Sequence, residues 1–218
     1  MSEFCSPYII DADLDLGIDD IGDTGGTDTL DFSSTGGFVA VNVDLSKITT
    51  QTIASGLQLT FSTVSIENIY GGGGDDTLFG NRLDNSIIGR SGKDTLFGGA
   101  GNDSFCFSDP LTGASILSVR LGKDRIVDFT KGQDKIVLIK STFTAITSAV
   151  DGSIGSNFAT IANDTLTGSS AAAIVYSLDR GNLFYNQNSA KPGLGFGLSF
   201  ATLTDIPTLA ASDFSIVI

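Results

Sequence analysis

Oxygen-bearing side chains recur at every ninth residue in the middle of the chain. Between Gly71 and Cys106 the sequence divides into four nonapeptides, GGGGDDTLF, GNRLDNSII, GRSGKDTLF and GGAGNDSFC, and each begins with a glycine. Position 6 of these nonapeptides is occupied by Asp76, Asn85, Asp94 and Asp103, and position 8 by Leu78, Ile87, Leu96 and Phe105. Carboxylate and amide oxygens beside a flexible glycine backbone form the kind of ligand set that a hard cation prefers.

The nine-residue spacing restricts the elements that can hold these side chains. Nine residues make two and a half turns of an α-helix, so position 8 would alternate between opposite helix faces. The same length fits a turn at positions 1–6 and a short strand at positions 7–9, in which position 8 points away from its two neighbours. Stacked repeats of this kind predict an all-β fold with a parallel β-roll and the position-8 side chains inside.

A stacked arrangement would bring the position-6 carboxylates of neighbouring repeats close together. Four apolar side chains stabilise too little to offset this repulsion together with the entropy lost in ordering the turns. Calcium takes six to eight oxygen ligands and combines carboxylates with backbone carbonyls, which glycine-rich turns can direct towards one point. The repeat therefore predicts several bound Ca2+ ions.

The repeat fades on both sides of the four clear nonapeptides, where the sequence favours other elements. Residues 14–22, 23–31 and 62–70 fit the nonapeptide pattern more loosely. Alternating or β-branched stretches predict strands at 38–46, 57–65 and 124–139, and a hairpin at 172–186. A short helix is an option at 157–163, within a region rich in Ser, Thr, Ala and Gly.

The chain has no linker or low-complexity tract, so we expect one continuous domain. We divide it into an N-terminal β-rich cap with degenerate repeats at 1–61, a β-roll at 62–107 and a C-terminal β-rich cap at 108–218. The roll should position the ligands, and the caps should cover its ends.

Composition argues against several classes of function. The chain has 218 residues, 25 of them acidic and 12 basic, with a net charge of −13, so neither nucleic acid nor an anionic membrane surface is an expected partner. The sequence contains no histidine, two distant cysteines, and neither HExxH nor GxSxG, so no hydrolase centre or disulfide framework is recognisable. No stretch approaches the roughly 18 apolar residues that span a bilayer. We expect a protein that is not an enzyme and does not insert into membranes.

The repeats resemble those of a known family. GGGGDDTLF and GGAGNDSFC fit the G-G-x-G-x-D-x-U-x pattern of the RTX (repeats-in-toxin, haemolysin-type) calcium-binding proteins. GGTDTLDFS (25–33), IENIYGGGGDDTLFGN (66–81), DRIVDFTKGQDKI (124–136) and the terminal SDFSIVI (212–218) resemble the C-terminal part of serralysin-type secreted proteases. The resemblance implies a calcium-binding module attached to a secreted protein.

The resemblance also implies a set of calcium ligands, because each ion in this family lies between two turns eighteen residues apart. One implied site combines Gly72, Gly74 and Asp76 with Gly89, Ser91 and Asp94. A second, on the opposite side, combines Asn81, Leu83 and Asn85 with Gly98, Ala100 and Asp103. The further implied ligands are Ser65 and Glu67 before the repeats, Arg90 and Gly92 in the third repeat, and Asp23, Gly25, Gly26 and Asp28 near the N-terminus. In the fourth repeat Gly99, Gly101 and Asp103 are implied to face Asp124 and Asp134, which follow the repeats.

Three features depart from the family pattern. Asn85 offers a carbonyl oxygen without a charge, so sites that use it should bind calcium more weakly. The turn that holds Arg90 and Asp94 should be followed by an acid at position 112, where this sequence has Thr112. The half-site at 23–28 has no partner upstream in this sequence, which suggests the C-terminal piece of a longer protein.

The resemblance further implies type I export, for which the uncleaved C-terminus serves as the signal. The last six residues, DFSIVI, have the implied form of an acid followed by apolar residues, and MSEFCSPYII at the start lacks the features of a classical signal peptide. We therefore expect a secreted, extracellular module that meets the type I secretion machinery transiently and folds when it reaches calcium. Two alternatives stay open: an extracellular adhesin or surface-layer component, and a polysaccharide-acting β-helix enzyme that uses carboxylates.

Overall fold

Strands make up nearly all of the regular structure. The computed structural model describes residues 17–21, 26–35, 39–108, 122–147, 152–188 and 199–218. Within these ranges the helices are three short 3-10 segments, η1 (Gly155–Asn157), η2 (Asp164–Ser169) and η3 (Ala211–Asp213). The prediction of an all-β chain is therefore confirmed. No helix in the same ranges is long and apolar enough to cross a membrane.

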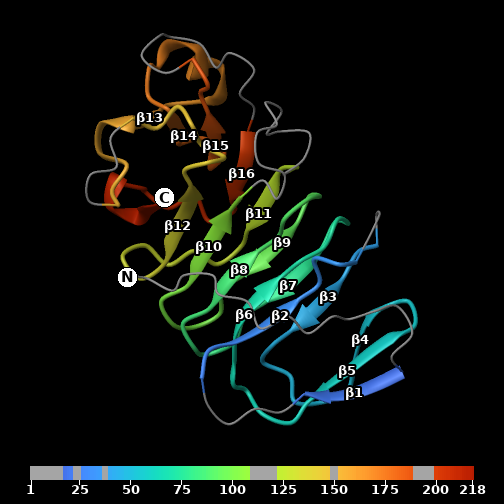
Figure 1. Ribbon diagram of the computed structural model, residues 1–218. Helices are drawn as coiled ribbons and strands as arrows, with labels where there is room; N and C mark the ends of the chain where they lie inside the picture. The colour runs from blue at the N-terminus through green and yellow to red at the C-terminus, as the bar shows by residue number, and fades with distance from the viewer. Residues whose placement is uncertain (1–16, 22–25, 36–38, 109–121, 148–151, 189–198) are drawn as a thin grey trace.

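The strands form three open sheets (Figure 1). The six-stranded sheet contains, in spatial order, β17 (Phe214–Val217), β12 (Lys135–Ile139), β10 (Ser104–Phe107), β8 (Ser86–Ile88), β6 (Ile66–Tyr70) and β2 (Asp28–Asp31). The eight-stranded sheet contains β13 (Phe158–Ile161), β14 (Ile174–Ser177), β15 (Asn182–Tyr185), β16 (Ser199–Leu203), β11 (Asp124–Ile126), β9 (Thr95–Phe97), β7 (Thr77–Phe79) and β3 (Asn42–Asp44). The three-stranded sheet contains β1 (Gly17–Ile21), β5 (Leu57–Phe61) and β4 (Gln51–Ala54).

Consecutive nonapeptides contribute their strands to different sheets. β7 and β9 pair in parallel in the eight-stranded sheet, with Leu78 opposite Leu96. β8 and β10 pair in parallel in the six-stranded sheet, with Ile87 opposite Phe105. Strands that pair are therefore eighteen residues apart, and the glycine-rich turns between them carry the chain from one sheet to the other.

The interior between the two larger sheets is built from position 8 of the repeats. Leu78, Ile87, Leu96 and Phe105 are fully buried. They belong to one cluster with equivalent residues of the flanking strands, namely Val43, Ile69, Ile126 and Ile136. Full burial of such a side chain stabilises a fold by about 1.5–3 kcal/mol. Burial of position 8 therefore also holds in place the turn residues at position 6, two residues earlier in each repeat.

Position 9 lies on the outer faces of the same sheets, because side chains alternate along a strand. On the eight-stranded sheet the rings of Phe79 and Phe97 stack with centroids 4.1 Å apart. On the six-stranded sheet a separate buried cluster contains Tyr70, Ile88, Cys106 and Val137.

The C-terminal third confirms one sequence expectation and contradicts another. β14 and β15 form the antiparallel hairpin predicted at 172–186, with Ile174 opposite Tyr185. The short helix considered at 157–163 is wrong, because Phe158–Ile161 is the strand β13 and pairs in parallel with β14. Sheet pairing overrides the weak local preference of this segment.

The loosely matching segment at 14–22 also has a different place from the repeats. Its described part is β1, which pairs with β5 in the three-stranded sheet, with Asp19 opposite Leu59. This segment therefore does not continue either of the larger sheets.

Candidate calcium-binding site

Position 6 of the repeats forms two stacks, one along each of the larger sheets. In one stack the backbone N–H of Asp76 donates to Asp94 Oδ1 at 2.8 Å, and that of Asp94 donates to Asp124 Oδ1 at 3.0 Å. In the other stack the N–H of Asn85 donates to Asp103 Oδ1 at 2.8 Å, and that of Asp103 donates to Asp134 Oδ1 at 3.0 Å. We call these sets the first column, Asp76, Asp94 and Asp124, and the second column, Asn85, Asp103 and Asp134.

The column side chains are buried without cationic partners. None of the six is more than 2% exposed. The ion pairs within the described ranges involve other acids, and no Lys or Arg pairs with a column carboxylate there. Burial of a carboxylate without a counter-charge disfavours its ionised form and destabilises the fold that contains it.

Burial raises the pKa of every acidic column member. Desolvation raises the pKa of Asp76 and of Asp103 from 3.8 to about 6, and the pKa of Asp94 to about 8. It also raises the pKa of Asp124 and of Asp134. Neighbouring carboxylates raise these pKa values further, whereas hydrogen bonds from backbone N–H groups lower them without offsetting the desolvation. An ion of opposite charge between the turns would favour the ionised forms.

The third repeat closes its turn differently from the first two. In the first repeat the N–H of Gly72 donates to Asp76 Oδ2 at 2.7 Å, and in the second that of Asn81 donates to Asn85 Oδ1 at 2.8 Å. In the third repeat Arg90 stands at position 2 with φ 72°. Asp94 Oδ2 is buried and has no hydrogen-bond partner among the described residues. Asp94 Oδ2 therefore has lone pairs that are not used within this turn, as a metal ligand requires.

Glycines at position 4 let successive turns approach closely. A Cβ added at Gly92 would lie 2.0 Å from the carbonyl oxygen of Gly74, which is a backbone atom of the preceding turn on the same side. A Cβ at Gly101 would lie 2.5 Å from the carbonyl oxygen of Leu83. Real Cβ atoms do not come this close to backbone, so the stacking distance depends on these two glycines. The carbonyl groups of Gly74 and Leu83 are thereby held between turns.

Substitution of Gly92 by alanine should strongly destabilise the fold. Gly92 has φ +127°, and the added Cβ would displace the Gly74 backbone. The free energy of unfolding in calcium should fall by about 3 kcal/mol or more, from backbone strain together with overpacking. Gly132→Ala is the matched control, because Gly132 also has a positive φ (+83°) but nothing within 4 Å of an added Cβ. Equal losses in urea unfolding would show that stacking does not depend on close approach at Gly92.

The donor set fits calcium better than a transition metal. The described part of the chain contains no group of three or more His, Cys, Asp or Glu side chains that could hold a metal by themselves. The implied sites instead combine one carboxylate or amide oxygen from each turn with backbone carbonyls. Oxygen-only sets of this type suit a large, hard cation and lack the nitrogen or sulfur that zinc prefers.

The structure brings the two main implied ligand sets together. Gly72 and Ser91 are adjacent, since the N–H of Ser91 donates to the Gly72 carbonyl at 3.4 Å, and the Asp76–Asp94 hydrogen bond joins the same two turns. In the other set the N–H of Ala100 donates to the Asn81 carbonyl at 3.0 Å. Each of the two carbonyl groups accepts one backbone hydrogen bond from the described part of the chain, and a carbonyl oxygen has a second lone pair.

The implied ligands near the N-terminus are described only in part. Asp23 and Gly25 lie outside the described residues, whereas Gly26 is exposed with φ +110°. The N–H of Asp28 donates to Glu67 Oε2 at 2.8 Å, so the second column continues towards β2 through Glu67. Ser65, the neighbour of this column, bonds Thr63 through its hydroxyl at 2.6 Å.

The implied ligands after the repeats have different neighbours from those expected. Asp124 was expected opposite the fourth repeat, but it bonds Asp94 of the third, whereas Asp134 bonds Asp103 as expected. Thr112, the expected neighbour of Arg90, lies outside the described residues. The partner of the third repeat is thus the turn at Asp124, which follows Asp94 after 30 residues.

Two further degenerate repeats explain this register. FTKGQDKIV (129–137) has Gly132 at position 4, Asp134 at position 6 and Ile136 at position 8. VRLGKDRIV (119–127) has the same three types of residue at the same positions, of which 122–127 are described. The spacing of glycine and acid within each of these two segments was visible in the sequence. The separation between paired column residues, however, grows from 18 residues within the clear repeats to 30 and 31 residues at these segments, so the nine-residue period is interrupted before them.

Three exposed or half-buried acids support the turns and were not predicted. At position 5 Asp75 accepts from the N–H of Lys93 at 2.8 Å, and Asp84 accepts from that of Asn102 at 2.7 Å. Asp128 accepts from two consecutive N–H groups at the start of the fourth repeat, at 2.8 and 3.0 Å. These contacts hold adjacent turns together without taking a place in the columns.

Without metal, the chain should gain stability as the pH falls. The folded-state pKa values of Asp76, Asp94 and Asp103 lie above 3.8, so between pH 3.8 and about 6–8 the unfolded chain releases protons that the folded chain keeps. The free energy of unfolding then decreases as pH rises through this window. Thermal melts in calcium-free buffer should show a more stable fold at pH 5 than at pH 8, and saturating calcium should reverse the order because protons compete for the ligands. Greater stability at pH 8 without metal would contradict the burial of these acids.

The family assignment rests on a match to the greater part of the chain. Residues 11–175 match the family described as Peptidase M10 serralysin C terminal, and the chain belongs to this family. The resemblance to the C-terminal part of serralysin-type proteins is thereby confirmed. This region is the non-catalytic part of such proteases.

A curated relative gives a second, shorter match. The chain is 40% identical over 125 residues to metalloprotease AprA of Pseudomonas entomophila (strain L48). The alignment covers 53% of this chain and 25% of that protein, so this chain spans only about a quarter of the relative's length.

Proposed function

We propose that the chain is a calcium-binding RTX module whose repeats form a parallel β-roll and fold on calcium binding after type I export. The observation that carries this proposal is the pair of buried columns, whose carboxylates form no ion pair with a Lys or Arg side chain within the described ranges. Membership of the serralysin C-terminal family supports it. We further propose that the module belongs to a secreted, extracellular protein and has no catalytic role.

The proposed roll is centred on 62–107, with β-rich caps at 1–61 and 108–218. Hydrogen bonds of the first column reach Val41, whose N–H donates to Asp76 Oδ1 at 2.9 Å, and Asp124 on the other side. Those of the second column reach Asp134. In this proposal each cap therefore adds turns and strands that stack on those of the repeats. The proposed boundaries mark where the sequence stops matching the nonapeptide pattern closely.

The proposed ligands are the carboxylates and carbonyls of stacked turns. Gly72, Gly74 and Asp76 would face Gly89, Ser91 and Asp94; Asn81, Leu83 and Asn85 would face Gly98, Ala100 and Asp103. Bound calcium would supply the positive charge that the columns lack. One ion at 100 times its Kd adds about 2.7 kcal/mol to the folded state, so several sites together can decide whether the chain folds.

The same residues account for the proposed link to export. Where calcium is scarce, the acids of the columns would have to be buried either ionised and close to one another or protonated at a pH where the unfolded chain is ionised, and both oppose closure of the coils. The chain can then pass a narrow exporter unfolded. At extracellular calcium concentrations the carboxylates gain a counter-charge, and the turns close on the apolar core. A calcium titration followed by far-UV circular dichroism tests this proposal, and its expected result is given in the Discussion.

Deletion of residues 213–218 should abolish export but leave calcium binding by the repeats. These residues contain the whole of β17, an edge strand that pairs with β12 and buries Phe214 and Ile216. Removing them should cost about a few kcal/mol through lost apolar burial. A secretion assay with a type I exporter, paired with a calcium titration of the purified truncation, checks both parts. Normal export of the truncated chain would contradict the proposed role of the tail, and loss of calcium binding would show that the tail and the repeats are not separable.

A further inference from the structure

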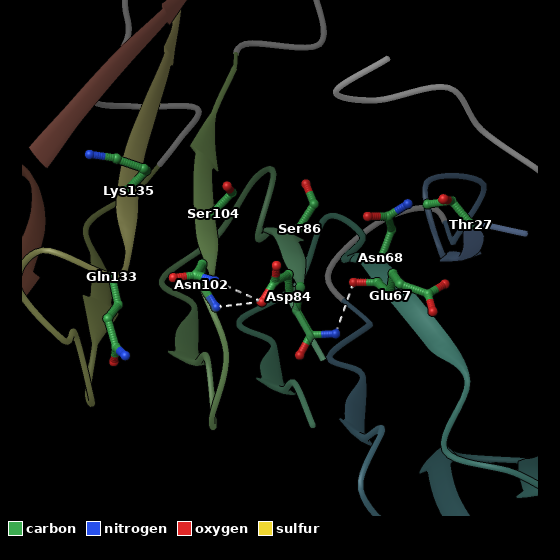
Figure 2. A pocket seen from close by; sticks show the side chains of 10 residues that line it. Thr27, Glu67, Asn68, Asp84, Ser86, Asn102, Ser104, Gln133 and Lys135 are labelled. Carbon is green, nitrogen blue, oxygen red and sulfur yellow. Dashed lines mark hydrogen bonds between the residues drawn. The ribbon is translucent and has the colours of Figure 1, made fainter. Parts of the chain in front are cut away.

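A polar groove of about 440 Å³ lies across the outer face of the six-stranded sheet. Its walls come from consecutive parallel strands and from the turns before them, as Figure 2 shows. One row of side chains, Asn68, Ser86, Ser104 and Lys135, occupies matching register positions on β6, β8, β10 and β12. The second row, on the side of the turns, contains Glu67, Asp84, Asn102 and Gln133.

The spacing within the rows is that of the sheet itself. Neighbouring strands lie about 4.7–4.9 Å apart, so a polar group recurs at this interval along the groove. An extended chain of ring-shaped units lying across the strands would meet an equivalent group at each step. The volume also falls within the range of small-molecule sites, roughly 300–1,000 Å³.

The lining offers both donors and acceptors with remaining capacity. Ser104 Oγ and the Gln133 side-chain amide make no hydrogen bond among the described residues, and Asp84 uses only Oδ1, towards Asn102. Hydroxyl, amide and carboxylate groups together can pair with a ligand whose own groups both donate and accept. Sugar hydroxyls have this property.

Several lining side chains are already held in place. Asn68 Nδ2 donates to Thr29 Oγ1 at 3.0 Å, and Asn102 Nδ2 donates to Asp84 Oδ1 at 3.2 Å. Asn85 Nδ2 donates to the Glu67 carbonyl at 3.0 Å. Groups fixed in this way lose little conformational entropy when a ligand binds.

The charge of the lining residues argues against an anionic ligand, and the strand pairing within the sheet argues against an extended peptide. Glu67 and Asp84 line the groove together with one cation, Lys135, whose ammonium group donates to the Ser212 carbonyl at 2.5 Å, so the lining has a net negative charge that disfavours an anionic ligand. An extended peptide normally binds by adding to a strand edge, but β8 and β10 are paired on both sides and offer no edge.

We propose that this groove binds a neutral oligosaccharide in an extended conformation, laid across β6, β8, β10 and β12. The proposal rests on the proposed function in one respect: the turn residues that form one wall take their places only when the coils are closed. Oligosaccharide binding is therefore expected in calcium and is absent from the unfolded chain. No catalytic step is involved.

Binding of neutral hexasaccharides to the full chain tests the proposal. The probes are cellohexaose, xylohexaose and the fully N-acetylated chitohexaose, measured by isothermal titration calorimetry in millimolar calcium, with hexagalacturonate as the anionic probe and a decapeptide of Ser, Thr and Asn as the peptide probe. At least one neutral hexasaccharide should bind. The double variant S86A/S104A should weaken that binding about tenfold, as expected for the loss of two hydrogen bonds, and S104Y should block the groove and abolish it.

Thr77→Ala with Thr95→Ala is the matched control. These threonines occupy position 7 on the eight-stranded sheet, are half-buried as Ser86 and Ser104 are, and lie outside the groove. Their removal should leave oligosaccharide binding unchanged. Binding of none of the neutral probes to calcium-folded protein, binding of only the anionic or peptide probe, or equal effects of the two double variants would overturn the proposal.

A calcium titration of the same samples separates this proposal from the proposed function. If calcium folds the chain and no neutral probe binds, only the groove proposal fails. If the chain folds without calcium and a neutral hexasaccharide still binds in an S104Y-sensitive manner, the groove proposal stands and the folding switch fails.

Discussion

Chelation of calcium is expected to unfold most of the chain. In EGTA at pH 7.5 the far-UV circular dichroism should lack most of the β-sheet signal, and millimolar calcium should restore it. The reason is that Asp76, Asp94 and Asp124 are buried one above another, as are Asp103 and Asp134, and burial raises the pKa of each. At neutral pH their ionisation opposes the fold unless a cation compensates.

Magnesium is the control for this prediction. It demands near-octahedral geometry at short distances and gives up its water reluctantly, so wide, carbonyl-rich turns should hold it poorly. Magnesium at the same concentration should leave the chain unfolded. A spectrum that is identical in EGTA and in calcium would contradict the folding switch, and full recovery in magnesium would show that charge alone is sufficient.

Asp94→Ala is expected to lower the apparent calcium affinity at least tenfold, which corresponds to about 1.4 kcal/mol. Asp94 is fully buried, links its own turn to those of Asp76 and Asp124, and keeps Oδ2 without a hydrogen-bond partner among the described residues. In the proposed site the substitution removes both a ligand oxygen and a charge. Terbium luminescence or calorimetric titration measures the change.

Asn85→Ala is the comparison, and its effect should be of a different kind. Asn85 carries no charge, but its Nδ2 donates to the carbonyl groups of Ile66 and Glu67 at 3.4 and 3.0 Å, and its Oδ1 accepts from the N–H of Asn81. Asn85 therefore joins neighbouring turns through its amide N–H groups. An aspartate at this position could not donate these hydrogen bonds and would carry a charge that an ion must compensate. Its loss should lower the free energy of unfolding by about 1–3 kcal/mol with a smaller shift in calcium affinity. Equal shifts in calcium affinity for the two variants would mean that the column register is misassigned.

The period of the repeat carried most of the information about the core. Position 8 is apolar at every repeat, and Leu78, Ile87, Leu96 and Phe105 are all fully buried. A period of nine is incompatible with one helix face, so the pattern alone predicted strands. The family resemblance also implied that the turns of Asp76 and Asp94 lie together, because each ion in that family lies between two turns eighteen residues apart, and the hydrogen bond between these residues joins the two turns.

Other parts of the site could not be predicted in the same way. Asp124 follows Asp94 by 30 residues, and only the sheet pairing of β11 with β9 shows that the two are equivalent. Val41 stands where the columns otherwise place an acid or an amide, so no chemical pattern marks its turn. The supporting contacts of Asp128 depend on the distance between turns in space, which a linear pattern does not contain.

The misplaced helix at 157–163 shows the limit of local preference. The segment FATI has no strong periodicity, and a strand forms there because β14 offers a parallel partner, with Phe158 opposite Ile174. The nonapeptides are different in this respect, since each carries its own turn chemistry and its own core residue. Sequence reasoning therefore works best where one short unit contains both.

Hydrogen exchange of the position-6 amides tests the central claim most directly. The N–H groups of Asp76, Asn85, Asp94 and Asp103 each donate to the side chain of the next turn in their column. If calcium closes the columns, these four amides should be strongly protected in millimolar calcium and should exchange at least about 100-fold faster in EGTA, as expected for a stabilisation of roughly 2.7 kcal/mol or more. Equal protection of the four amides in calcium and in EGTA would show that the columns close without metal and would contradict the account.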